Sequence, residues 1–289
     1  MQVRIARKIE LEKDRKMSTA KKILFTDLDG TLLNDQKQIS AINRRAIAEA
    51  LDKGHKITIA TGRPLQSGIV SARELGLDQA GCYMIAYNGA VIYDFSKEQI
   101  CSEKFMTRSQ LKYLFTEGEK AGIYVQTYSD TAIWTNKECK ELQFYSKASG
   151  MPYEIHENVA EELNELPHKI LMVELENSQR LLEFQQQHSE WEKKNCLSIF
   201  STEEYLEYCP FGATKGEGVC FLAQRFGINI EDTIAIGDER NDISMIESAG
   251  IGVAMKNAKE CVKESADVIT VADNNHDGVA EIIYKYILT

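Results

Sequence analysis

The chain has 289 residues, and its 43% hydrophobic content is enough to build the cores of about two domains. Its 34 basic and 44 acidic residues give a formal charge of −10, which argues against a polyanion-binding groove and a polybasic membrane patch, so we expect no nucleic-acid and no membrane partner. The seven cysteines are scattered and form no C-x-x-C pair, which argues against disulfides and a zinc cluster. The chain has no apolar run of about 18 residues and no apolar signal-peptide core, which argues against a membrane span and secretion. These observations favour the cytoplasm.

Residues 1–20 are expected to form an N-terminal extension. Charged and aliphatic side chains alternate there, which is typical of a short frayed helix or strand. The alternative is that the native protein starts at Met17, so the sequence leaves open whether residues 1–16 belong to it. Neither interpretation bears on function.

A series of apolar, β-branched runs bounded by turn residues predicts strands that are buried on both faces. Helical patterns lie between them: Ser40 is the expected N-cap of a helix closed by Gly54, and a second helix is expected from Ser67 to Leu75, closed by Gly76. This alternation predicts an α/β fold in which right-handed crossovers build a parallel sheet with helices on both faces. The expected strands lie at residues 22–26, 56–60, 82–87, 233–236, 251–254 and 268–271.

The alternation stops between residues 90 and 209, where hairpin-like strands mix with helical patterns. This stretch has apolar content of its own, so we expect an inserted α+β domain rather than a linker. The parallel-sheet pattern then resumes at Lys215. The predicted core domain is therefore discontinuous, with residues 21–89 and 210–289 on either side of an insertion at 90–209.

Two carboxylates, Asp27 and Asp29, directly follow the first predicted strand. Ligands of an open α/β sheet bind beyond the carboxyl ends of its strands, and Asp238 follows another buried strand. Three carboxylates at one crevice repel one another unless a hard cation neutralises them, and Mg²⁺ is the natural choice. This hypothesis requires Asp238 to lie within about a dozen ångströms of Asp27.

An isolated Asp-x-Asp pair has other interpretations. It is also typical of helix caps and turns, and of nucleotide-sugar transferases that use a divalent cation. An EF-hand loop is excluded, because Thr31 stands at the third ligand position and Gly30 comes too early.

Four further residues at predicted strand ends and helix starts are candidates for the site, and the first two are suited to binding an anion. Thr61 and Gly62 offer a hydroxyl and a backbone N–H at a strand-to-helix turn. Lys215 opens a helix where the core resumes, and Asn241 follows the third carboxylate by about one helical turn. Each also has a simpler interpretation as a turn residue or a surface lysine. Asp242 is either part of the site or the cap of the next helix.

Together these motifs resemble the haloacid dehalogenase superfamily of phosphohydrolases, specifically the Cof-type sugar-phosphate phosphatases with a type IIB cap. DLDGTLL, ATGRP, TKG and GDERNDISM occur in the family's order and spacing, and YNGA resembles the segment that leads into the cap. The resemblance extends from about residue 22 to the C-terminus. It implies a Rossmann-like core and an inserted α+β cap that closes over the site, excludes water and recognises the leaving group.

The resemblance also implies a magnesium-dependent phosphoryl transfer in two steps. Asp27 would attack phosphorus and form an aspartyl-phosphate, while Asp29 would give a proton to the leaving group and later take one from water. The metal would be held by the Asp27 carboxylate, the Asp29 backbone carbonyl and Asp238. The residues implied to bind the phosphoryl oxygens are Thr61, Gly62, Lys215 and Asn241.

The chain departs from the family at one point, because Glu239 and Arg240 are both charged where the family often has a small or polar residue at the first of these positions. Either the two pair with each other or Arg240 faces the substrate entrance. Arg63 is either a phosphate contact or the partner of a loop carboxylate.

The sequence therefore predicts a Mg²⁺-dependent phosphoric monoester hydrolase that acts on small phosphorylated metabolites, sugar phosphates first among them. A phosphotransferase or phosphomutase of sugar phosphates is one alternative, because a sugar hydroxyl can replace water as acceptor. A non-catalytic sugar-phosphate sensor is another, although a sensor does not need both Asp27 and Asp29. A monomer and a homodimer are both compatible with the sequence.

Overall fold

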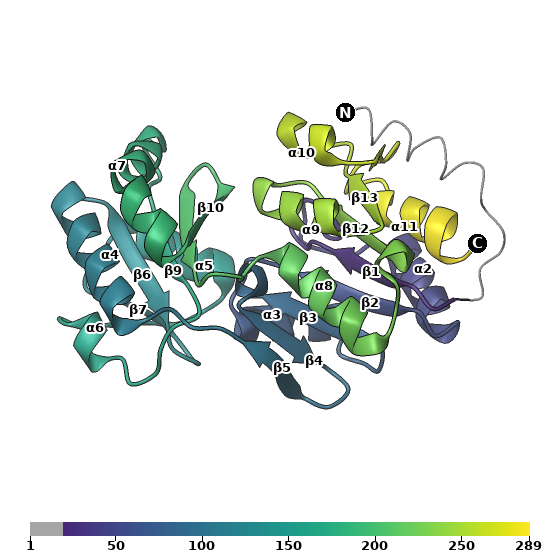
Figure 1. Cartoon of the computed structure of the whole chain (residues 1–289), viewed down its shortest axis with the longest axis horizontal. Coiled ribbons are helices and arrows are strands. Elements are labelled where there is room, and N and C mark those ends of the chain that lie inside the picture. The colour runs from purple at the N-terminus through teal and green to yellow at the C-terminus, as the bar shows by residue number, and fades with distance from the viewer. Residues whose placement is uncertain (1–19) are drawn as a thin grey trace. The chain divides into compact units, whose positions relative to one another are not determined.

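The computed structural model of the chain describes residues 20–289 (Figure 1). The expected N-terminal extension lies outside the described residues except for Ala20. The described chain divides into two compact units, one made of residues 20–60, 79–83 and 215–289 and the other of residues 61–78 and 84–214. The domain boundaries expected from the sequence stay a prediction.

The first unit is built on parallel strands whose side chains are mostly buried. Strand β1 pairs with β2 on one side and β12 on the other, so that Ile23 is opposite both Lys56 and Thr233. Strands β13 and β14 continue the parallel arrangement beyond β12. The bounds are β1 (Ile23–Thr26), β2 (Lys56–Ala60), β12 (Thr233–Gly237), β13 (Ile251–Ala254) and β14 (Val268–Ile269).

Helices cover both faces of this sheet (Figure 1), with α8 and α9 packed together on one face and α2 and α11 on the other. Ser40 caps α2 as expected, because its side chain accepts a hydrogen bond from the backbone N–H of Asn43. The helices are α2 (Ala41–Asp52), α8 (Lys215–Phe226), α9 (Ile243–Ser248), α10 (Glu260–Ser265) and α11 (Gly278–Ile282), with a π-helix at Ile283–Ile287 and 3₁₀ turns at Ile230–Asp232 and Arg240–Asp242.

Among the described residues, the larger sheet has eight strands in the order β14-β13-β12-β1-β2-β3-β4-β5. The last pair is an antiparallel hairpin, so the sheet is mixed rather than wholly parallel. These strands are β3 (Cys82–Ala86), β4 (Val91–Asp94) and β5 (Gln99–Glu103). The predicted α/β class with helices on both faces is confirmed, and the antiparallel edge is the departure from an all-parallel sheet.

The second unit contains a separate six-stranded sheet in the order β10-β11-β9-β6-β7-β8. Residues of β6, β9 and β11 pack with helices α4 and α7 into one core, in which Leu114, Met172, Leu181 and Leu206 are buried. The strands are β6 (Tyr124–Tyr128), β7 (Ile133–Thr135), β8 (Tyr153–Ile155), β9 (Ile170–Val173), β10 (Leu197–Thr202) and β11 (Tyr205–Cys209). The helices are α3 (Leu65–Leu75), α4 (Arg108–Ala121), α5 (Lys140–Ser149), α6 (Val159–Glu162) and α7 (Gln179–Asn195).

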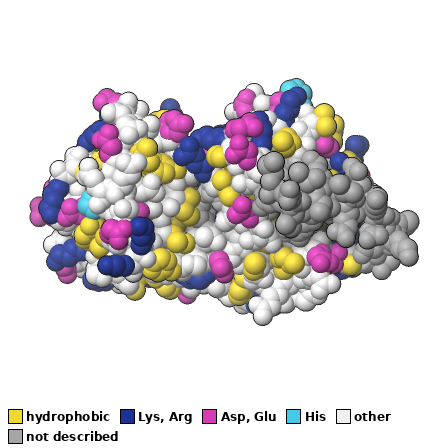
Figure 2. Space-filling view, turned by 45° about the horizontal axis from the view of Figure 1, so that its top comes forward, with side chains coloured by type: hydrophobic (Ala, Val, Ile, Leu, Met, Phe, Trp, Pro, Cys, Tyr) yellow, Lys and Arg dark blue, Asp and Glu magenta, His cyan; other side chains and the backbone are white. Residues whose placement is uncertain are grey.

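Two further sequence expectations can be compared with the structure. All seven cysteines are free thiols. In the described part of the chain, no helix combines the length and the apolar character needed to cross a membrane. Acidic and basic side chains are interspersed over the face shown in Figure 2.

Candidate active site

Asp27 directly follows strand β1 and is held in the first unit by backbone and side-chain contacts. Its backbone N–H donates to the carbonyl of Ile236 in β12, 3.1 Å away, which continues the sheet ladder past the end of β1. Its carboxylate is buried, and Oδ1 accepts a hydrogen bond from Nζ of Lys215 at 2.6 Å. Lys215 is the first residue of α8 and is itself buried. Two of the predicted site residues, Asp27 and Lys215, are therefore in direct contact.

Asp242 fixes both the lysine and the loop after β12. Its Oδ1 accepts from Nζ of Lys215 at 2.6 Å, and its Oδ2 accepts from the backbone N–H groups of Asp238 and Glu239, each at 2.9 Å. The side chain is fully buried. Of the two roles left open for Asp242, the hydrogen bonds favour one inside the site: it shapes the Asp238 loop and orients Lys215.

Asp238 completes a cluster of three carboxylates. Ligand atoms of Asp27, Asp238 and Asp242 all lie within 4.8 Å of one another, so the distance that the magnesium hypothesis requires is satisfied. Oδ1 of Asp238 accepts a hydrogen bond from the Thr31 hydroxyl at 2.6 Å. Gly30 has a positive φ of 79°, and a Cβ there would collide with the Asp238 carboxylate, so only glycine leaves room for this arrangement.

The cluster of Asp27, Asp238, Asp242 and Lys215 contains more acidic than basic groups. Burial, reinforced by neighbouring carboxylates and opposed by Lys215, raises the pKa of Asp27 to about 7. Burial and the charges of Asp27 and Asp242 raise the pKa of Asp238 to about 9. The two carboxylates hold the pKa of Lys215 above its ordinary value although burial alone would lower it. Three ionised carboxylates and one ammonium would leave two negative charges in a buried space.

This donor set fits a hard divalent cation. Magnesium prefers carboxylate and carbonyl oxygens, and a charge of +2 matches the excess that the cluster carries when all its carboxylates are ionised. Asp27 and Asp238 keep carboxylate oxygens for such an ion, whereas both oxygens of Asp242 are taken by Lys215 and the loop. Asp242 is therefore better suited to positioning Lys215 and the Asp238 loop than to binding a metal ion.

Asp29 lies in a different environment from Asp27. Its side chain is 39% exposed and forms an ion pair with Lys37, whose Nζ is 2.7 Å from Oδ1. Lys37 has a positive φ of 59°. This contact is not expected from the sequence, since a lysine in a polar loop is normally a solvated surface residue.

The remaining predicted site residues are divided between the two units. Thr61 and Gly62 follow β2 and belong to the second unit: the Thr61 N–H donates to Ile85 at 2.8 Å, and the Gly62 carbonyl accepts from Nζ of Lys169 at 2.7 Å. Asn241 lies in the 3₁₀ turn Arg240–Asp242 of the first unit.

The charged residues left open by the sequence also have contacts. Glu239 forms an ion pair with Lys259 at 3.2 Å, so its side-chain ion pair is not with Arg240. Nη1 of Arg63 donates to the Ser71 hydroxyl at 2.8 Å. Thr31, which binds the Asp238 carboxylate, is the site residue that the sequence reasoning missed, although its place in DLDGT was a usable signal.

Comparison with known proteins adds an independent line of evidence. The model of a protein family described as haloacid dehalogenase-like hydrolase matches residues 24–283. The chain belongs to this family. The predicted resemblance to its Cof-type phosphatases is confirmed, and this haloacid dehalogenase-like hydrolase is a phosphoric monoester hydrolase.

Several relatives of this hydrolase cover nearly its whole length. The 5-amino-6-(5-phospho-D-ribitylamino)uracil phosphatase YcsE of Bacillus subtilis is 31% identical over 268 residues, which cover 92% of this chain and 96% of that protein. A haloacid dehalogenase-like hydrolase from Bacteroides thetaiotaomicron has a TM-score of 0.82 and 30% identity, covering 92% of this chain and 99% of the other. The HAD subclass IIB sugar phosphatase BT4131 has a TM-score of 0.77 and 26% identity, covering 93% and 100%.

Proposed function

We propose that this hydrolase removes phosphate from small phosphorylated metabolites, sugar phosphates first among them, in a Mg²⁺-dependent reaction that passes through an aspartyl-phosphate at Asp27. The observation that carries the proposal is the group of three buried carboxylates around the buried ammonium of Lys215. Similarity to a subclass IIB sugar phosphatase supports the substrate class.

Asp27 is proposed as the nucleophile. Lys215 donates to its Oδ1, and within residues 20–289 no hydrogen bond reaches Oδ2, so that oxygen is free to attack. As the bond from Oδ2 to phosphorus forms, the bond from phosphorus to the leaving oxygen breaks, and this oxygen takes a proton. Water then attacks the phosphorus of the aspartyl-phosphate, which releases inorganic phosphate and regenerates Asp27.

Asp29 is proposed to move the proton in both steps. Its half-exposed carboxyl lets it exchange protons with substrate and solvent, unlike the buried Asp27. The ammonium of Lys37, 2.7 Å from Oδ1, holds the Asp29 side chain in place.

Lys215 is proposed to bind a phosphoryl oxygen while it holds the nucleophile. An ammonium has three N–H donors, and two of those on Lys215 go to Asp27 and Asp242. The third is available for the transferring group, whose equatorial oxygens carry the charge in the transition state. Because Asp242 is anchored by two backbone N–H groups, the ammonium is positioned before substrate arrives.

Asp27, Asp238 and the backbone carbonyl of Asp29 are proposed to hold the magnesium ion. When bound, the ion would neutralise the carboxylate cluster and polarise a phosphoryl oxygen. The Thr31 hydroxyl fixes the orientation of the Asp238 carboxylate.

The roles of Thr61, Gly62 and Asn241 in binding phosphoryl oxygens stay predictions that rest on the family resemblance. A cytoplasmic location, the absence of nucleic-acid and membrane partners, and the choice between monomer and homodimer likewise stay predictions from the sequence.

The proposal is tested with a panel of phosphorylated metabolites assayed with Mg²⁺ and with a chelator. We expect phosphate release from some sugar phosphates only with Mg²⁺ and none above background from Asp27→Asn. Asp52→Asn changes an exposed carboxylate of α2 in the same way and should retain wild-type turnover. Equal rates for wild type and Asp27→Asn would overturn the proposal.

The same assay separates the two alternatives. Phosphate release without an added acceptor argues against a phosphotransferase or mutase, and turnover itself excludes a pure sensor. Acid quench during turnover should trap a hydroxylamine-sensitive phosphate on wild type and none on Asp27→Asn, because an acyl phosphate requires the Asp27 carboxylate. Turnover without a trapped acyl phosphate would contradict the two-step route.

A further inference from the structure

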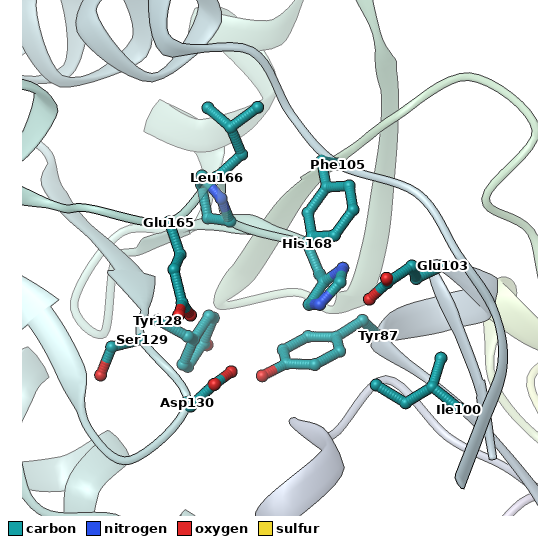
Figure 3. Close-up of a pocket in the computed structure, with 11 residues that line it drawn as sticks. Tyr87, Ile100, Glu103, Phe105, Tyr128, Ser129, Asp130, Glu165, Leu166 and His168 are labelled. Atoms are coloured by element: carbon teal, nitrogen blue, oxygen red, sulfur yellow. The ribbon is translucent and has the colours of Figure 1, made fainter.

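The second unit contains a cavity of about 430 Å³ that none of the proposed catalytic residues lines. It lies among the 3₁₀ turn at Tyr87–Gly89, the end of β5 with the segment after it, the turn between β6 and β7, and the segment just before β9 (Figure 3). A volume of this size is typical of sites for small organic molecules. The chemistry of the residues that line the cavity therefore indicates which kind of small molecule it would bind.

Aromatic rings form one wall of the cavity. The rings of Phe105 and His168 are stacked with centroids 4.6 Å apart, and Tyr87 lies 5.2 Å from His168 on a tilted plane. Tyr87 also contacts Tyr128 at 5.7 Å, so four rings form a continuous series. Phe105, which lines the cavity, is 41% exposed.

Three carboxylates accompany these rings, and no lysine or arginine lines the cavity. Figure 3 shows the carboxyl groups of Asp130 and Glu165 close to Tyr87 and Tyr128, with Glu103 beside His168. Among the described residues, none of the three carboxylates has an ion-pair partner.

His168 adds another acceptor. Its Nδ1 lies 2.9 Å from the carbonyl oxygen of Lys104, and because a carbonyl can only accept, Nδ1 carries the proton. In the neutral ring Nε2 is therefore an acceptor. Carboxylates, this nitrogen and the negative faces of aromatic rings all favour a positively charged ligand and disfavour an anion.

From this combination we propose that the cavity binds a small organic cation, namely a protonated amine carried on an apolar body. The ammonium group contacts the faces of the rings and the three carboxylates, while the apolar body covers Phe105 and its apolar neighbours Ile100 and Leu166, which are 43% and 40% exposed. This site is separate from the proposed phosphatase chemistry and does not depend on it.

The proposal is tested by measuring binding of phenethylammonium to the full chain by calorimetry and by NMR. Neutral 2-phenylethanol and anionic phenylacetate are the matched probes, since they keep the apolar body and change only the charge. We expect the cation to bind about tenfold or more tightly than the alcohol, and phenylacetate not to bind measurably. Binding of the alcohol as tight as that of the cation would overturn the proposal.

Two sets of variants assign the binding to this cavity. Glu103→Gln/Asp130→Asn/Glu165→Gln removes the three carboxylates and should weaken the cation by about tenfold or more, because the ring contacts alone remain. Asp52→Asn/Asp78→Asn/Glu231→Gln makes the same change in net charge at exposed carboxylates elsewhere and should leave binding unchanged.

Phe105→Ala should weaken both the cation and the alcohol, since it removes the stacked ring that both probes cover. Equal weakening by the two triple variants would mean that only net charge attracts the probe, and the proposal would be wrong. Far-ultraviolet circular dichroism and the melting temperature confirm that each variant is folded.

Discussion

The two units each bury a lysine, and the two lysines have different surroundings. Lys215, in the first unit, contacts Asp27 and Asp242 and lies beside the third carboxylate, Asp238. Lys169, in the second unit, forms an ion pair with the single carboxylate of Glu207 at 3.0 Å. One cluster has an excess of negative charge and the other is neutral.

The Lys169 network balances its own charges. Nζ of Lys169 also donates to the Gly62 carbonyl at 2.7 Å, and the Glu207 carboxylate accepts from the Ser201 hydroxyl at 2.6 Å and from the Asn88 amide. A buried ion pair whose charges cancel and whose carboxylate oxygens accept further hydrogen bonds needs no counter-ion. The comparison teaches that burial of a lysine does not indicate a site, whereas an unbalanced count of charges around it does.

The largest expected effect breaks the neutral network. Lys169→Met leaves Glu207 buried without its cation and should lower the free energy of unfolding by about 3–5 kcal/mol, measured by urea denaturation. Lys169→Met/Glu207→Gln removes the unpaired charge and should recover part of this loss. If the double variant instead loses the sum of the two single effects, the charges do not act as a pair.

Loss of the other lysine should affect catalysis most. Lys215→Met should lower kcat by about 10²–10³ at saturating Mg²⁺, because one donor to the phosphoryl group and the orientation of Asp27 are lost together. Steady-state kinetics below the melting temperature measures this change. If folded Lys169→Met lost as much kcat as Lys215→Met, the two buried lysines would not differ in their role in catalysis.

A smaller effect is expected from the residue that orients Asp238. Thr31→Val removes the hydroxyl that donates to this carboxylate while keeping the shape of the side chain. The Mg²⁺ concentration for half-maximal activity should rise about tenfold, as is typical when a hydrogen bond to a metal ligand is lost. Thr131→Val, in an exposed position of the second unit, should leave it unchanged.

A last effect is expected on the pH dependence of stability in metal-free protein. Because the pKa of Asp27 is raised to about 7 and that of Asp238 to about 9, the folded chain holds more protons than the unfolded chain above about pH 4. Stability from these groups is therefore complete at low pH and is lost as the pH rises through 7 and 9.

Thermal unfolding with a chelator across this range should show a melting temperature that falls by roughly a few degrees for each kcal/mol lost. Added Mg²⁺ should raise it most at high pH, where the carboxylates are ionised. Asp238→Asn should flatten the metal-free profile. A metal-free profile of the same slope in wild type and this variant would contradict the proposed excess charge.

Much of the core could be predicted from the sequence because its strands are short apolar runs between turn residues. The strands at Lys56–Ala60 and Ile251–Ala254 match the expected bounds residue for residue. β5 was missed because the side chains of Gln99–Glu103 are mostly exposed, so no buried run marks it. Tyr87, expected to end a strand, instead has a positive φ of 49° and begins a 3₁₀ turn.

The candidate site was predictable where spacing carried the information. Asp27, Lys215 and Asp238 stand at strand ends or a helix start, and the parallel topology brings those ends to one edge. The Lys37 contact with Asp29 and the position of Lys169 were not predictable, because they depend on loop geometry and on strand pairing far apart in the sequence. The spacing of apolar residues along the chain carries no information on either of these contacts.

The pairing of β1 with β12 has a consequence for how the chain matures on the ribosome. Ile23 needs Thr233 as its neighbour, so the first of the described strands waits for one synthesised about 200 residues later. At translation rates of about 5–20 residues per second this delay is about 10–40 s, during which an apolar strand with an open edge is exposed. Chaperone binding to nascent chains should therefore decline only once residues beyond β12 have left the exit tunnel.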